Sequence, residues 1–291
     1  MEIQRLRYFL AVARSLHFRK AAEKTGTTQP NLTRQLRILE DSLGTTLLDR
    51  DRRNVQLTVS GARLLPLAEQ IVNLVEALGD KVRAPNRPKV IRIGHIPAAL
   101  FSIIPKEIRA FQKLLPGVDF SLSEGFPPQL LRALSASTID LAFSLGAATG
   151  GELSSRMISS ERNLIALPSD NVAAKRKGPL ALQELLNLDW ITIPDSHRPA
   201  PTDPLLSYMD YLGFAPSRRK LVETQQAILG YVAAGQGFAL LPACLAKMAP
   251  RTVTFKHAAD PLPKFNVFVI WRRTELDSDV IRIIKQRYEH R

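Results

Sequence analysis

Three polar residues in one short segment have side chains that could read DNA bases. They are Gln29, Thr33 and Arg34. A glutamine amide can pair with two hydrogen-bonding groups of adenine, an arginine guanidinium can do the same with guanine, and a threonine hydroxyl can donate or accept. We predict that this segment contacts DNA, with Asn31 beside them and Pro30 offering apolar contact to a thymine methyl group.

Two short helices around a tight turn would position these side chains. A first helix begins near residue 3, and a second covers residues 18–24. Gly26 can adopt a positive φ in the turn, Thr28 suits a helix N-cap, and Pro30 suits the first helical turn. The next helix has apolar residues along one face, namely Leu32, Leu36 and Leu39. This arrangement is typical of a helix-turn-helix.

A basic hairpin is predicted directly after these helices. Residues 55–57 alternate between apolar and polar side chains, as expected of a strand. Arg52 and Arg53 would lie at the hairpin tip and Arg50 at its base. Guanidinium groups in this position suit phosphates or a narrow minor groove. The sequence therefore predicts a winged helix-turn-helix DNA-binding domain over residues 1–58.

A long helix, with Thr58 or Ser60 as its N-cap, is predicted to follow the hairpin. Apolar residues recur along it at intervals of three and four, namely Leu67, Ile71, Leu74 and Leu78. Such a stripe on an isolated helix predicts pairing with a second copy of the chain. Pro66 lies within the helix and removes a hydrogen bond, which favours a kink. We assign residues 59–88 to a linker and dimerisation helix and a hinge.

The chain from residue 89 to 291 alternates between short apolar runs and amphipathic segments. This pattern is typical of βαβ units, in which helices cover the faces of a parallel sheet. The units fall into two successive series. We therefore predict an α/β domain of two lobes with a ligand cleft between them.

Charge favours a polyanionic partner. Lys and Arg number 40 against 27 Asp and Glu, a net charge of +13. The first 53 residues hold a disproportionate share of this excess, which points to the N-terminal module as the surface that meets nucleic acid.

Several classes of function find no support. One cysteine, Cys244, excludes an intramolecular disulfide framework and suits a small buried apolar residue. The histidines have no metal-ligand spacing, and no apolar run is long enough to span a membrane. Nucleophile-elbow, phosphate-loop and dinucleotide-binding motifs are missing, so we expect no enzyme and no cofactor. The opening residues lack a secretory pattern, which predicts a cytoplasmic location.

The N-terminal residues also resemble those of LysR-type transcriptional regulators. The resemblance rests on residues 6–12, 18–22, 29–36, 39–40, 43–44, 47–48 and 57–58, with a looser match at 232–237 and 241–242. It implies a DNA-binding homodimer or homotetramer, with RNA polymerase as a further partner. Its effector domain would be of the periplasmic-binding-protein type, with lobe I at about 89–161 and 265–291 and lobe II at about 162–264. Thr25 and Thr27 stand where the family commonly has apolar residues, a departure that would weaken the packing of the turn.

The resemblance further implies where a small-molecule inducer would bind. The implied pocket residues are Ala98, Ala99, Ser102, Phe126, Pro127, Pro199, Ala200 and Pro201. Residues 194–201 and 223–237 are most similar to regulators of aromatic-compound degradation, including the muconate- and benzoate-responsive subgroup. This points to an aromatic or dicarboxylic acid, although Ala98 lacks a hydroxyl often found near its position. His95 and His197 lie near this region and could contact an acid, although a structural or solvated histidine is the commoner case.

Two further readings remain open. An architectural DNA binder whose sensor domain does not respond would have the same N-terminal features. A solute-binding protein would account for residues 90–291 alone, but not for the basic module that precedes them.

Overall fold

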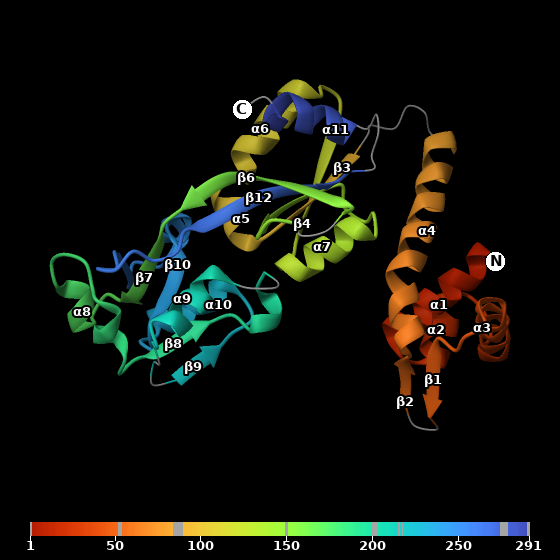
Figure 1. Ribbon diagram of the computed structural model, residues 1–291, viewed down its shortest axis with the longest axis horizontal. Coiled ribbons are helices and arrows are strands. Elements are labelled where there is room, and N and C mark those ends of the chain that lie inside the picture. The colour runs from red at the N-terminus through yellow and green to blue at the C-terminus, as the bar shows by residue number, and fades with distance from the viewer. Residues whose placement is uncertain are drawn as a thin grey trace. The chain divides into compact units, whose positions relative to one another are not determined.

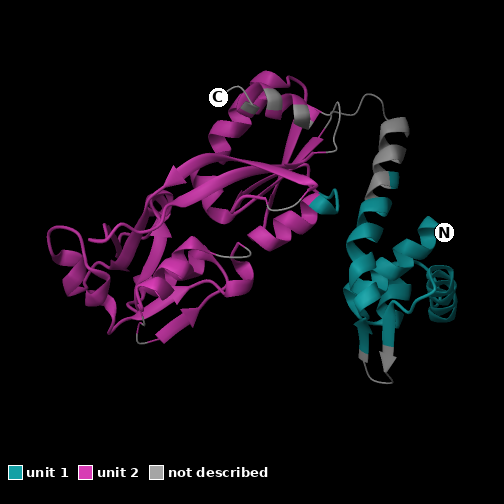
Figure 2. Cartoon of the chain, viewed as in Figure 1, with its two compact units in different colours: residues 1–87, 135–138 teal, residues 88–134, 139–291 magenta. Residues whose placement is uncertain are grey.

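The computed structural model describes residues 2–51, 54–83, 90–148, 151–199, 203–214, 216, 218–273 and 279–289. The chain forms two compact units, coloured separately in Figure 2. The first contains residues 1–87 with 135–138, and the second contains residues 88–134 with 139–291. Each unit has a hydrophobic core of its own.

The first unit contains three short helices, a hairpin and one long helix (Figure 1). Its elements are α1 (Ile3–Ser15), α2 (Phe18–Lys24), α3 (Gln29–Leu43), β1 (Leu48–Asp51), β2 (Asn54–Leu57) and α4 (Val59–Arg83). Apolar side chains from all four helices pack into one core. The predicted winged helix-turn-helix and long helix are confirmed.

The turn between α2 and α3 has the predicted geometry. Gly26 has a φ of +64°, where a residue with a Cβ would be strained. The Thr28 side-chain oxygen accepts a hydrogen bond from the backbone N–H of Asn31 at 3.4 Å, and Pro30 lies in the first turn of α3. The expected apolar face of α3 is buried, with Leu32, Leu36 and Leu39 at its centre. Burial of this face directs the opposite, polar face outward.

The hairpin is tied to α3 by one buried carboxylate. Strands β1 and β2 are antiparallel and pair Leu48 with Leu57. Glu40, near the end of α3, accepts hydrogen bonds through Oε1 from the backbone N–H groups of Leu47 at 2.9 Å and Leu48 at 3.2 Å. These bonds satisfy a charge that would otherwise be costly to bury. They fix the start of the hairpin relative to the preceding helix.

Helix α4 continues without a break from Val59 to Arg83, although Pro66 lies inside it. Thr58 Oγ1 accepts a hydrogen bond from the backbone N–H of Gly61 at 3.0 Å, which confirms the predicted N-cap. An ion pair of 3.0 Å joins Arg14 of α1 to Glu69 of α4. Among the described helices, none is both long enough and apolar enough to cross a bilayer.

Lobe I of the second unit is built on a five-stranded sheet, ordered β4-β3-β5-β12-β6. Its strands are β3 (Val90–His95), β4 (Asp119–Glu124), β5 (Leu141–Leu145), β6 (Leu153–Glu161) and β12 (Phe265–Arg272). Its helical elements are α5 (Pro97–Ser102), α6 (Ile104–Leu114), α7 (Pro127–Ser135), α11 (Asp279–Ile284) and the π-helical turn η4 (Lys285–Glu289). Figure 1 shows α6 and α11 together near the C-terminus.

A buried ion pair holds the end of the chain against lobe I. Glu107 of α6 is almost completely buried and accepts hydrogen bonds from the guanidinium of Arg287, one of them at 2.7 Å. The Tyr288 hydroxyl donates to the same carboxylate. Burial beside this negative charge raises the pKa of Tyr288 strongly. The three side chains join segments that are far apart in the sequence.

Lobe II contains a three-stranded and a two-stranded sheet. Its strands are β7 (Asn163–Pro168), β8 (Asp189–Thr192), β9 (Arg218–Leu221), β10 (Ala239–Pro242) and β11 (Val253–Lys256). Its α-helices are α8 (Val172–Lys175), α9 (Pro204–Tyr211) and α10 (Gln225–Ala233). Its 3-10 helices are η1 (Leu182–Leu185), η2 (Asp195–His197) and η3 (Ala243–Met248).

The expectation of parallel sheets is only partly correct. Strand β3 is parallel to β4 and β5, and β8 is parallel to β9, but β12 is antiparallel to both β5 and β6, and β7 is antiparallel to β10 and β11. Strand β6 takes the chain out of lobe I and β12 brings it back, so the two run in opposite directions. Strands β6 and β11 were not predicted.

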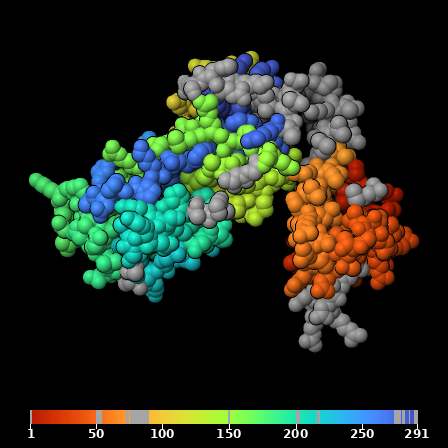
Figure 3. Space-filling view, viewed as in Figure 1, coloured from red at the N-terminus to blue at the C-terminus, as the bar shows by residue number. Residues whose placement is uncertain are grey.

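The lobes also share buried apolar side chains. The largest core cluster includes residues of both lobes, among them Ala98 of α5 and Cys244 of η3. Figure 3 shows the surface of lobe II, in green to teal, meeting that of lobe I, in yellow to lime. The second unit therefore has two lobes that are in direct contact.

Candidate functional site

Helix α3 presents most of its predicted DNA-contacting side chains to solvent. Gln29, Pro30 and Arg34 are exposed, and Thr33 is half-buried. Together with the exposed Arg37, they line a shallow hollow of about 370 Å³. The hollow combines two guanidinium groups with amide, hydroxyl and apolar surface. This surface can offer hydrogen bonds to the base edges of a DNA duplex and positive charge to its phosphates.

Asn31 differs from these neighbours because its amide is engaged within the protein. Its Nδ2 donates to Thr27 Oγ1 at 2.9 Å, and its Oδ1 accepts from Arg34 Nη2 at 3.3 Å. The two bonds connect the turn before α3 with the exposed guanidinium. Sequence reasoning missed this connection, although the unusual Thr27 was a signal for it.

Arg52 and Arg53 lie outside the described residues, as does the side chain of Arg50. Their predicted contacts with DNA remain predictions.

Two residues of the predicted apolar stripe on α4, Leu67 and Ile71, are exposed. Leu67 is 54% and Ile71 37% exposed, whereas Ala68 and Val72 are buried on the other side of the helix. The side chains of Leu74 and Leu78 are outside the described part of the chain. Large apolar side chains in this position are typical of a helix that packs against a partner.

Two residues expected in the effector pocket lie in the core. Ala98 and Ala99 have no exposed surface. The Ala98 carbonyl oxygen is 3.7 Å from Cys244 Sγ, because α5 packs against η3 of lobe II. Ser102 is half-buried and its hydroxyl donates to the Ala98 carbonyl at 3.2 Å. In this conformation neither alanine is accessible to a ligand.

Two other expected pocket residues, Phe126 and Pro199, lie where the lobes meet. The Phe126 ring stacks on the His197 ring of lobe II, with centroids 3.7 Å apart and planes inclined by 8°. Pro127 is buried at the start of α7, and Pro199 is buried in lobe II. Ala200 and Pro201 lie outside the described residues. Sequence analysis placed His197 in this region but did not predict its contact with Phe126.

Cys244 has the predicted character of a small buried residue. Burial, together with the nearby Glu161 carboxylate, raises the pKa of its thiol to about 12. A neutral thiol is a poor nucleophile and a poor metal ligand. Among the described residues, no group of His, Cys, Asp and Glu side chains is arranged to hold a metal ion.

The fold and these surfaces define a DNA-binding regulator with a ligand-sensing domain. Two family models match the chain: the bacterial regulatory helix-turn-helix protein of the lysR family over residues 3–62, and the LysR substrate binding domain over residues 86–287. The second covers more than half of the chain. The chain therefore belongs to the LysR family of transcriptional regulators.

Relatives along nearly the whole length agree with this assignment. The chain is 31% identical to a probable cat1 operon transcriptional activator of Acinetobacter lwoffii over 250 residues, covering 85% of this chain and 82% of the relative. It is 32% identical to the transcriptional regulator TfdS of Cupriavidus pinatubonensis over 269 residues, covering 92% and 91%. The expectation of a regulator instead of an enzyme is confirmed.

Solved structures show the same architecture. Full-length CbnR in complex with its target DNA aligns with a TM-score of 0.71 and 25% identity, covering 98% of both chains. Full-length BenM aligns with a TM-score of 0.60 and 26% identity, covering 98% of this chain and 95% of that one. The predicted fold class is thus confirmed.

Proposed function

We propose that this regulator binds a promoter operator as a dimer and that a small anionic effector between its lobes changes how it binds and bends the DNA. The observation that carries the DNA-binding part is the outward face of α3, where Gln29, Pro30, Thr33 and Arg34 line one hollow. The buried leucines on the opposite side of α3 hold this face in place. The proposed domains are residues 1–58, 59–88 and 89–291.

The bonding of Asn31 gives a more specific account of base reading. We propose that Gln29, Pro30, Thr33 and Arg34 meet the bases, with Arg50, Arg52 and Arg53 on the backbone or in the minor groove. Asn31 acts by orienting Arg34, since both ends of its amide are hydrogen-bonded within the protein. A guanidinium that is already oriented loses less conformational freedom when it binds.

Selection of binding sites from a random DNA duplex library tests the DNA-binding proposal. We expect the full-length chain to enrich one sequence, and to bind it more tightly than bulk DNA at the same salt concentration. Equal affinity for selected and bulk DNA would instead favour an architectural DNA binder.

The exposed apolar stripe on α4 supports dimerisation. We propose that Leu67, Ile71, Leu74 and Leu78 pack against a second copy of the helix, with tetramers formed from two dimers. Leu67→Asp should produce monomers in analytical ultracentrifugation, because the interface would bury a carboxylate without a partner. Leu67→Met retains apolar bulk and should remain dimeric. A dimeric Leu67→Asp variant would reject this interface.

The effector proposal rests on the junction between the lobes. Ser102, Phe126, Pro127 and Pro199 belong to segments close to this junction, and we propose that they line the ligand site with Ala98, Ala99, Ala200 and Pro201 once the lobes part. The proposed ligand is an aromatic or dicarboxylic acid, because residues 194–201 and 223–237 resemble those of regulators of aromatic-compound degradation.

Calorimetry against a panel of aromatic acids and muconates tests the ligand class. A binding heat, together with a change in the footprint on the selected DNA, is the expected result. No heat and an unchanged footprint across the panel would favour the reading in which the sensor domain does not respond. A cytoplasmic location and contact with RNA polymerase complete the proposal.

A further inference from the structure

One short segment of lobe II makes two contacts with lobe I. His197 stacks on Phe126, as described above. Two residues later, Pro199 approaches Gly146, at the end of β5. A Cβ added to Gly146 would lie 3.2 Å from Pro199 Cβ, and its φ of +79° also favours glycine. The segment around residues 197–199 is therefore closely fitted to lobe I.

Arg198, between these two contacts, extends in the opposite direction. Its backbone is extended, with φ −98° and ψ 161°, so its side chain and those of its neighbours lie on opposite sides of the chain. The Arg198 side chain is only 7% exposed. Because side chains alternate in direction along this extended segment, those of His197 and Pro199 face the junction, and that of Arg198 lies inside lobe II.

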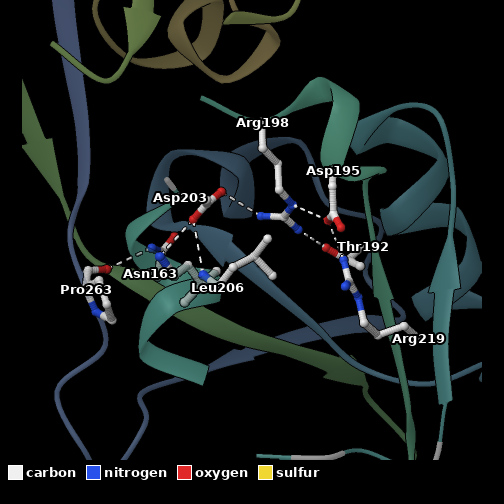
Figure 4. A network of polar contacts seen from close by, with 9 residues as sticks. Asn163, Thr192, Asp195, Arg198, Asp203, Leu206, Arg219 and Pro263 are labelled. Atoms are coloured by element: carbon white, nitrogen blue, oxygen red, sulfur yellow. Dashed lines mark hydrogen bonds and ion pairs between the residues drawn. The ribbon is translucent and has the colours of Figure 1, made fainter. Parts of the chain in front are cut away.

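The Arg198 guanidinium binds three parts of lobe II (Figure 4). Nη1 donates to Asp203 Oδ2 at 2.7 Å, and Nη2 donates to the hydroxyl of Thr192 at the end of β8. Nε lies 3.6 Å from Asp195 Oδ1, an oxygen that also accepts from Arg219 Nη2 at 2.7 Å. The Arg198 guanidinium therefore joins Asp195 and Asp203 to Thr192 at the end of β8.

Asp203 makes this connection rigid because it has a second role. Its Oδ1 accepts from the backbone N–H groups of Leu205 at 2.7 Å and Leu206 at 3.3 Å, and so caps α9. The N-terminus of α9 fixes the Asp203 carboxylate, and this carboxylate holds the Arg198 guanidinium in place. Arg198 in turn holds its neighbours His197 and Pro199 at the junction. On the exposed side, Glu223 Oε2 lies 3.6 Å from His197 Nε2.

We propose that Arg198 is the positioning residue of the junction between the lobes: by binding Thr192, Asp195 and Asp203 inside lobe II, it fixes residues 195–199, sets the stacking of His197 on Phe126 and hence the closure of the effector domain. The regulatory consequence rests on the proposed effector function, because a ligand between the lobes would act against or through this contact. The geometric claim is independent of any ligand.

Distances between spin labels on the two lobes test the proposal in the full-length protein. Lys113→Cys on α6 and Val172→Cys on α8 provide exposed attachment sites. The native Cys244 is buried, and its thiol pKa is raised to about 12, so it competes little for the label. We expect one narrow distance distribution for the doubly labelled parent. Arg198→Lys retains the charge but loses the forked geometry, and should broaden the distribution.

Arg272→Lys is a matched control. Arg272 has a similar exposure of 8% and donates to the backbone carbonyls of Leu134 at 2.7 Å and Ile139 at 2.6 Å, both in lobe I. We expect both lysine variants to lower the melting temperature, whereas only Arg198→Lys broadens the distance distribution. Thr192→Val removes one hydrogen bond of the network and serves as a milder variant if Arg198→Lys does not fold.

Phe126→Leu tests the same contact from lobe I. It should broaden the distribution, and Arg198→Lys should add little in that background because both act through one contact. The proposal is overturned if the parent distribution persists in Thr192→Val and in every folded Arg198→Lys sample, or if Arg272→Lys broadens it equally. A parent protein that selects no DNA sequence would contradict the proposed function while leaving this measurement valid.

Discussion

The DNA-binding face of α3 and the junction between the lobes differ in how the chain assembles them. The surface on α3 draws its side chains from Thr27 to Arg37, and one turn and one buried helix face orient them. The junction draws on Phe126, Gly146, residues 195–199 and Asp203, which only the folded domain brings together. The first surface is encoded by local spacing and the second by long-range packing.

The largest expected effect tests long-range packing. Glu107→Ala leaves Arg287 without its buried partner and removes the acceptor for the Tyr288 hydroxyl. We expect the free energy of unfolding to fall by about 3–5 kcal/mol, the range for loss of one partner from a buried ion pair. Urea denaturation followed by tryptophan fluorescence measures it, since both tryptophans, Trp190 and Trp271, lie in the effector unit.

Arg14→Ala provides the contrast in the DNA-binding unit. The Arg14–Glu69 pair has an arginine that is more than half exposed, so its loss should cost less than about 1 kcal/mol. Circular dichroism measures it, because the helices of that unit contribute to the signal, whereas the unit contains no tryptophan. If Glu107→Ala cost no more than Arg14→Ala, the tail would not depend on its buried ion pair.

The second-largest expected effect is on DNA binding by the outward face of α3. Arg34→Ala should weaken binding to the selected operator by about 1–3 kcal/mol and relax the sequence preference at one position, as expected for loss of a base contact. Fluorescence anisotropy at fixed salt measures the affinity. Arg109→Ala, an exposed arginine of the effector unit, serves as the control. Unchanged affinity would remove Arg34 from the residues that contact DNA.

The same contrast explains what the sequence could predict. Gly26, Thr28 and Pro30 determine the turn and the start of α3 through their own backbone preferences, so their roles were evident from spacing alone. The stacking of Phe126 on His197 depends on two lobes meeting, and no local pattern contains that information. Strand β6 was missed because its half-buried polar residues give little of the alternation that identifies a strand.

A smaller effect tests whether Asn31 orients Arg34. Thr27→Val keeps the shape of the side chain but removes the oxygen that accepts from Asn31 Nδ2. Operator binding should weaken by about 0.5 kcal/mol, at the lower end of what one hydrogen bond contributes. In the Arg34→Ala background the same substitution should have no further effect, because the guanidinium it orients is gone. An equal loss in both backgrounds would assign Thr27 a separate role.

The smallest effect concerns Cys244, whose Sγ lies beside the Ala98 carbonyl of lobe I. Because its thiol pKa is raised from 9.0 to about 12, the thiol keeps its proton in the folded chain after it has ionised in the unfolded one. Its contribution to stability is therefore complete below about pH 9 and is lost as the pH rises toward about 12. Cys244→Ala should remove that part of the alkaline decline. At pH 8 a thiol reagent should modify the folded parent far more slowly than the urea-unfolded chain, and equal rates would mean that the contact between α5 and η3 opens freely.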